Sequence, residues 1–103
     1  MRIIALKTLK IYIEKYPPAS GALRSWNEEV SEADLETPNG LKAQFGNASS
    51  IGKKRVVLNI HGNMFRLIVD VEYKFKLVFV VWFGTHKEYD KIDAHAVKFD
   101  KID

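Results

Sequence analysis

The sequence predicts an α+β fold in which a small, curved, mainly antiparallel sheet carries two N-terminal helices on one side. Three observations support this class. Apolar residues recur at helical spacing in the N-terminal third, the second half changes to a period of two, and 103 residues suffice for one core. We therefore expect the order β-α-α-β-β-β with a short C-terminal helix, folded as one domain over residues 1–103.

Two amphipathic helices are predicted after a short strand at residues 2–6. Residues 7–16 form the first helix, which ends against Pro17-Pro18 because proline cannot continue a helix. Residues 22–32 form the second. The apolar stripes consist of Leu6, Leu9, Ile13 and Tyr16 in the first helix and of Leu23, Trp26 and Val30 in the second.

The following segment lacks a clear period. The sequence TPNG at residues 37–40 predicts a turn. Residues 41–51 are rich in Gly, Ser and Asn, so we expect a loop there with at most one helical turn near Lys42.

Three strands account for the second half of the chain. Residues 55–60 and 64–73 alternate in polarity around the tight turn HGN at residues 61–63, which predicts a hairpin. Residues 77–83 are almost continuously apolar, which is typical of a strand buried on both faces. In residues 64–73 one face is formed by Phe65, Leu67, Val69, Val71 and Tyr73, and the other by Arg66, Ile68, Asp70 and Glu72.

Composition excludes some classes of protein. The chain has no cysteine, so it forms no disulfide framework and no thiolate metal site, and this fits a reducing cytoplasm. The N-terminus lacks the apolar region of a signal peptide. The longest apolar run, residues 77–83, is far shorter than the ~20 residues of a membrane helix. We expect a cytoplasmic protein.

The basic residues are unevenly distributed. No acidic residue lies between Glu36 and Asp70. The basic side chains of that interval are Lys42, Lys53, Lys54, Arg55 and Arg66. An acid-free basic stretch predicts a polyanion partner, and the predicted strand order lets Arg66 and the Lys53-Lys54-Arg55 cluster converge on one concave sheet surface. The alternative is an ordinary solvated basic face.

A polar stretch, GTHKEYDKI, follows the most apolar strand. Thr85 and Glu88 have the spacing of a capping box, which predicts that a helix begins at Thr85. His86, Tyr89 and Asp90 then share one face of it. This cluster is either a functional site or an ordinary capped junction in which Tyr89 packs and His86 is solvated.

Two motifs together resemble a known family. LNIHGNMFRLIV, followed by VWFGTHKEYDKI, is similar to the HigB toxins of bacterial type II toxin–antitoxin systems, within the RelE-like superfamily. Met64 departs from the pattern because a basic side chain is expected there. The matching residues are Gly62, Asn63, Phe65, Arg66, Leu67, Thr85, His86, Tyr89 and Asp90, with Leu41-Lys42 upstream.

The resemblance implies an mRNA interferase that uses no metal and no cofactor, in many members acting on the ribosome. It also implies a cognate HigA-like helix-turn-helix antitoxin as a partner. In the implied reaction the 2′-hydroxyl attacks the adjacent phosphate. Arg66 suits phosphate because its guanidinium stays charged, and His86 exchanges protons near neutrality. The expected catalytic residues are His86, Arg66, Tyr89 and Lys87, and the expected RNA contacts are Lys42, Lys53, Lys54, Arg55 and Asn63.

Two other functions use the same features. A non-catalytic RNA-binding or ribosome-binding module would use the same basic sheet and aromatic residues, and only His86 and Tyr89 distinguish a nuclease from it. A protein-interaction domain without an RNA partner would bind polyanions weakly and without the steep salt dependence of a nucleic-acid contact.

Overall fold

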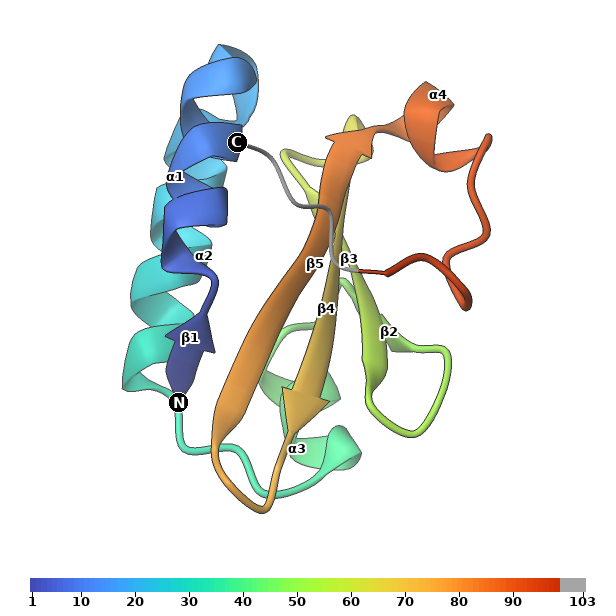
Figure 1. Cartoon of the computed structure of the whole chain (residues 1–103). Coiled ribbons are helices and arrows are strands. Elements are labelled where there is room, and N and C mark those ends of the chain that lie inside the picture. The colour runs from blue at the N-terminus through green and yellow to red at the C-terminus, as the bar shows by residue number, and fades with distance from the viewer. Residues whose placement is uncertain (99–103) are drawn as a thin grey trace.

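Five strands form one open, mixed sheet with the order β1-β5-β4-β3-β2 in the computed structural model, which describes residues 1–98 (Figure 1). β1 (Arg2–Ile4) runs parallel to β5 (Leu77–Thr85). All other neighbours are antiparallel. The remaining strands are β2 (Ala48–Ser50), β3 (Arg55–Ile60) and β4 (Phe65–Glu72). The predicted α+β class is confirmed.

Helices α1 (Leu6–Lys15) and α2 (Ser20–Glu32) lie together on one side of the sheet (Figure 1). A short 3-10 turn, η1 (Pro17–Ala19), joins them where the two prolines interrupt the first helix. The stripe of α2 is as predicted, whereas in α1 Tyr12 is buried and Leu6 is 41% exposed. None of the helices formed by residues 1–98 is long and apolar enough to cross a membrane.

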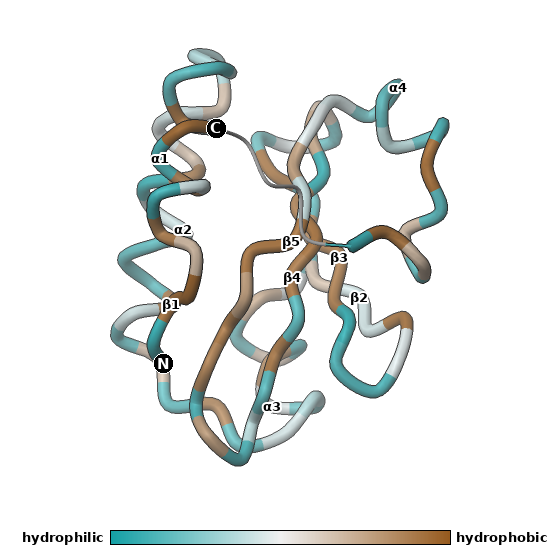
Figure 2. Tube along the Cα trace, viewed as in Figure 1, coloured by the Kyte–Doolittle hydropathy of each residue, from teal (hydrophilic) through white to brown (hydrophobic). Residues whose placement is uncertain are grey.

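The main core lies between these helices and the sheet. Along β4 the residues Phe65, Leu67, Val69 and Val71 are at most 4% exposed, and partly buried Tyr73 packs against the same cluster. The predicted apolar face of this strand is therefore confirmed, and Figure 2 shows the apolar character concentrated along β4 and β5. Each such side chain contributes about 1.5–3 kcal/mol on burial.

The prediction for residues 37–51, a turn and a loop with at most one helical turn near Lys42, is right about helix near Lys42 but wrong in leaving the rest irregular. The turn is the start of α3 (Pro38–Gln44), in which Thr37 Oγ1 accepts a hydrogen bond from the Gly40 N–H (3.1 Å). Leu41 and Phe45 pack into the core and are only 5% and 6% exposed. This burial stabilises the helix even though its Asn and Gly residues have low helix propensity. β2 forms because its backbone pairs with the edge of β3.

The second face of the sheet is also covered. α4 (His86–Tyr89) follows β5 directly, and residues 90–98 fold back beside the sheet (Figure 1). Ala94 packs in a second apolar cluster, whose other buried members are Val57, Ile68 and Val81. The middle of this face is therefore buried, but the prediction that the apolar run of β5 is buried on both faces holds only in part, because Phe79 is 39% exposed and Trp82 is half-buried.

Candidate functional site

The β3–β4 turn places Arg66 at one end of the sheet. His61 and Gly62 both have positive φ (55° and 65°), a backbone that glycine tolerates best and that suits a tight hairpin. The Asn63 that follows accepts two hydrogen bonds from Arg66: its carbonyl from Nη1 (3.1 Å) and its Oδ1 from Nη2 (2.7 Å). A third bond runs from Nη1 to the carbonyl of Phe65 (3.1 Å). The turn therefore orients the guanidinium.

The predicted capping box holds α4 against the same end of the sheet. The Thr85 N–H donates to Glu88 Oε1 (2.8 Å), and the Glu88 N–H donates to Thr85 Oγ1 (3.1 Å). The His86 N–H donates to the carbonyl of Met64 (2.9 Å), which ties the start of the helix to the start of β4. The side chains of α4 are thus set relative to Arg66 by backbone contacts.

A row of three side chains lies next to α4 and includes one from it. The row consists of Arg66, Tyr89 and Trp82. The Arg66 guanidinium carbon lies 5.8 Å from the centre of the Tyr89 ring, and the Tyr89 and Trp82 ring centres are 6.3 Å apart. Gly84 makes room for the indole, because a Cβ at that position would lie 2.6 Å from Trp82 Cη2. The two aromatic residues are neither fully buried nor fully exposed, so they offer a polarisable surface next to a cation.

His86 occupies the solvent side of α4. Its Nε2 lies 3.5 Å from Asp90 Oδ1, and the His86 and Asp90 side chains are 47% and 63% exposed. The carboxylate can orient the imidazole, while the ring stays accessible to a substrate. This arrangement is suited to proton transfer.

Glu88 has a structural task in the same helix. Its hydrogen bond from the Thr85 backbone is the main influence that lowers the pKa of the Glu88 carboxyl, with further help from the Thr85 hydroxyl, Tyr16 and Lys15. The Tyr16 hydroxyl donates to Glu88 Oε1 (3.1 Å) and so links the end of α1 to α4. The carboxylate is therefore held ionised as a cap.

The predicted basic residues do not all join Arg66. Lys42 donates to the carbonyls of Gly46 (2.7 Å) and Ala48 (2.8 Å) at the end of α3. Lys54 forms an ion pair with Glu72. Lys53 and Lys87 are exposed.

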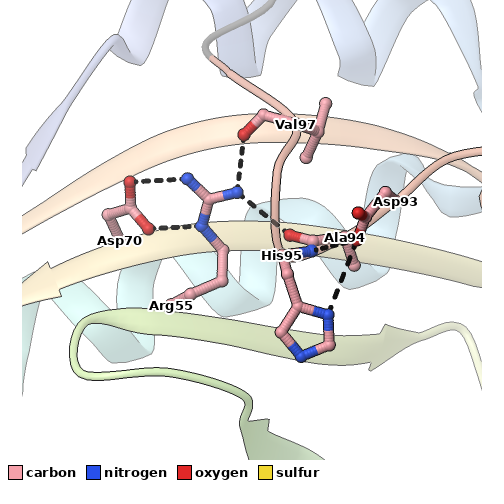
Figure 3. Close-up of polar contacts among 6 residues, drawn as sticks. All are labelled: Arg55, Asp70, Asp93, Ala94, His95 and Val97. Carbon is pink, nitrogen blue, oxygen red and sulfur yellow. Dashed lines mark hydrogen bonds and ion pairs between the residues drawn. The ribbon is translucent and has the colours of Figure 1, made fainter.

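Arg55, on β3, lies on the same face of the sheet as Arg66. Its partner on the neighbouring strand β4 is Asp70, which is four residues after Arg66. The Arg55 guanidinium lies beneath residues 94–97 (Figure 3). The expectation that all basic groups converge on one open surface is wrong for Arg55, because residues after α4 cover it.

The sequence patterns do not single out two residues of the site, Trp82 and Gly84. Trp82 lies in the apolar run of residues 77–83, and Gly84 begins the polar stretch that follows it. Their spacing of two residues on β5 places both on the face that carries Arg66, since Ile68 pairs with Trp82 and Arg66 with Gly84. The two-residue spacing is visible in the sequence, but the register with β4 is not. Among residues 1–98 no group of three or more His, Asp or Glu side chains is placed to hold a metal ion.

Comparison with known proteins gives consistent matches. Residues 19–92, which contain every residue of the row and of α4, match the HigB toxin family, described as the RelE-like toxic component of a toxin–antitoxin system. The mRNA interferase HigB of Escherichia coli O6:H1 is 32% identical over 97 residues, which cover 92% of this chain and 94% of the relative. The mRNA interferase toxin HigB of Escherichia coli K12 is 31% identical over 104 residues, covering 98% and 100%. The mRNA interferase HigB of Shigella flexneri matches to the same extent.

Proposed function

This chain belongs to the HigB family of RelE-like toxins of toxin–antitoxin systems, and from that premise we propose that it is an endoribonuclease that cleaves mRNA. The observation that carries the proposal is the placement of a fixed arginine, a tyrosine and an accessible histidine at one end of the sheet. Arg66 and Tyr89 are in contact at 5.8 Å, and His86 begins the helix that carries Tyr89.

The proposed reaction needs no group beyond these side chains. The 2′-oxygen of a ribose attacks the adjacent phosphorus, the bond to the 5′-oxygen breaks, and a proton moves from the first oxygen to the second. His86 is the proton-transfer residue, oriented by Asp90 at 3.5 Å. The products are a 2′,3′-cyclic phosphate and a 5′-hydroxyl.

Arg66 is the proposed phosphate ligand. A guanidinium has five N–H groups, and three of them are used on Asn63 and Phe65. Within the described residues this leaves the Nε–H and one Nη2–H for phosphate oxygens. Because Asn63 already orients the fork, little reorganisation is needed when charge develops in the transition state.

Tyr89 and Trp82 are the proposed platform for an unpaired base. Aromatic rings beside a cation favour base stacking, and RNA is usually recognised through such unstacked bases. Exposed Lys87 is the proposed phosphate contact next to this platform, and exposed Lys53, which precedes β3 near the Asp70 end of β4, is a proposed contact further along the RNA. The ammonium groups of Lys42 and Lys54 are engaged within the protein. We therefore propose that they contribute to the positive electrostatic potential of the surface and do not contact RNA directly.

The partners follow from the family. A toxin of this kind has an antitoxin, and we propose a HigA-like helix-turn-helix protein in that role, with the cytoplasm as the place of action. We also propose that mRNA is cleaved on translating ribosomes. Co-expression with the adjacent reading frame should relieve growth arrest and give a complex that co-purifies, and failure of both would refute this partner.

The activity is tested with purified wild-type protein and two variants. Wild type should cut mRNA on translating ribosomes and leave 2′,3′-cyclic phosphate ends, whereas His86→Ala should not. Glu28→Gln, at an exposed position of α2 away from the site, is the control and should cut normally. RNA binding without cleavage by wild type would instead support a non-catalytic module.

A further inference from the structure

The guanidinium of Arg55 is almost fully engaged inside the protein. Nε donates to Asp70 Oδ1 (2.5 Å) and Nη2 to Asp70 Oδ2 (3.0 Å), a two-point contact between β3 and β4. Nη1 donates to the carbonyls of Ala94 (3.0 Å) and Val97 (2.6 Å), as Figure 3 shows. Four of the five N–H groups are thus used, and the side chain is only 17% exposed.

The two carbonyls belong to a compact turn that follows α4. The N–H groups of Ala96 and Val97 donate to the carbonyl of Asp93 (3.0 and 2.9 Å), and the His95 N–H donates to Asp93 Oδ1 (3.0 Å). The carbonyls at the end of such a turn have no partner within it, and Arg55 supplies one. Arg55 therefore clamps the last turn of the described chain to the sheet.

This turn is connected to the site by packing and by the backbone. Hydrogen bonds from Lys91 to Glu88 (3.1 Å) and from Ile92 to Tyr89 (3.2 Å) continue α4 toward it. Tyr89, Ile92 and Val97 pack against the apolar cluster that contains Ala94, and Trp82 does so too. One end of the 85–97 segment is held by the capping box and the other by Arg55.

We propose that Arg55 is a positioning residue of the proposed ribonuclease. It acts through the clamped turn and the apolar cluster beneath it to hold Tyr89 and α4 against Arg66. This rests on the proposed function for its catalytic half. It replaces the role that the basic sequence cluster suggests, direct contact with RNA, because a guanidinium committed to a carboxylate and two carbonyls has one N–H left for a phosphate.

The two roles differ in what removal of Asp70 does. If Arg55 binds RNA, Asp70→Asn removes a competing negative charge and should tighten binding. If Arg55 positions the segment, Asp70→Asn and Arg55→Gln disrupt the same clamp. Both should then speed amide exchange in the segment and slow RNA cleavage. Glu28→Gln is the matched control for Asp70→Asn, since it makes the same charge change at an exposed position of α2.

The first measurement is hydrogen–deuterium exchange of the full chain, which needs no RNA. The amides of residues 92–97 should exchange about tenfold faster in Arg55→Gln and Asp70→Asn than in wild type and Glu28→Gln, because their protection depends on the clamp. Arg55→Lys should be intermediate, because an ammonium lacks the planar fork. Unchanged exchange of these amides in Arg55→Gln and Asp70→Asn would overturn the proposal.

The second measurement is single-turnover cleavage on programmed ribosomes, together with binding of a single-stranded RNA at several salt concentrations. In Arg55→Gln and Asp70→Asn the cleavage rate should fall by about 10- to 100-fold, the range expected when catalytic groups are displaced. The salt dependence of RNA binding should be unchanged in both. Lys53→Ala is the comparison for a true phosphate contact and should flatten that dependence by about 0.7 in slope.

The outcomes separate the two proposals. A flatter salt dependence in Arg55→Gln with tighter binding by Asp70→Asn would overturn positioning in favour of RNA contact. Faster exchange with a normal cleavage rate would overturn positioning without supporting RNA contact. Wild type that cleaves no RNA would refute the proposed function instead, and exchange would then decide by itself whether Arg55 holds the segment.

Discussion

Replacing Gly84 with alanine should destabilise the protein and disturb the site, although the change adds one methyl group. An ideal Cβ on Gly84 would lie 2.6 Å from Trp82 Cη2, 2.8 Å from Cζ2 and 3.0 Å from Glu88 Oε1. Contacts below 3.0 Å do not persist, so the indole has to move, and the capping carboxylate is crowded as well. The backbone of Gly84 lacks positive φ, so the effect is one of packing alone.

The size of the effect follows from the packing. Extra atoms in a packed site usually cost about 1–3 kcal/mol. In a domain of this size each kcal/mol lowers the midpoint of thermal unfolding by roughly 4–8 °C. Because the indole lies 6.3 Å from the Tyr89 ring, its displacement should also reduce RNA cleavage.

Gly21→Ala is the control for this variant. Gly21 lies in α2, and a Cβ there would meet nothing within 4 Å. Alanine should therefore stabilise the helix by about 0.5–1 kcal/mol. Thermal and urea unfolding followed by circular dichroism compare the two variants with wild type. Equal stability of Gly84→Ala and wild type, with normal cleavage, would refute the packing account of the site.

Three further predictions concern the site residues. His86→Ala should abolish growth arrest and mRNA cleavage while changing the free energy of unfolding by no more than ~0.5 kcal/mol, measured by urea denaturation, and an unfolded or fully toxic variant would contradict it. Arg66→Lys should keep the charge but lose the fork that Asn63 orients, so the cleavage rate should fall by roughly 10²-fold or more in a single-turnover assay, and a normal rate would exclude a role for the fork. Glu88→Gln should change acid unfolding. The pKa of the Glu88 carboxyl is lowered from its usual value of 4.5, chiefly by the hydrogen bond from the Thr85 N–H. The ionised carboxylate therefore stabilises the fold above about pH 4.5, and this stabilisation is lost as the pH falls through the folded pKa. The variant should therefore show a flatter dependence of stability on pH below about 4.5, and an unchanged profile would show that this cap adds nothing.

Much of the site is readable from short sequence patterns. The capping box at Thr85 and Glu88 is an exchange of hydrogen bonds over three residues, and it is present as predicted. The helix that it starts carries His86 and Tyr89, and the family match includes them within residues 19–92. Such features depend on neighbours in the chain, so their residue types and spacing suffice to recognise them.

The contacts of Arg55 and Trp82 depend on residues that are far away in the sequence. Arg55 and Asp70 are 15 residues apart, and Arg55 and the Val97 carbonyl are 42 apart, so no local pattern distinguishes this arginine from a surface cation. Trp82 likewise belongs to the site only because the β4–β5 register places it beside Gly84 and across from Ile68.

By itself the sequence determined the two amphipathic helices, the bounds of β3, the buried face of β4 and the cap at Thr85, because periodicity and capping act within a few residues. Only the tertiary structure decided that the segment after Thr37 forms α3 and β2, since packing of Leu41 and the free edge of β3 stabilise what propensity does not favour. It also decided which basic groups face solvent. Burial and pairing across the sheet are properties of the assembled layers, and they place Arg55, a predicted RNA contact, against Asp70 and beneath the carbonyls of Ala94 and Val97.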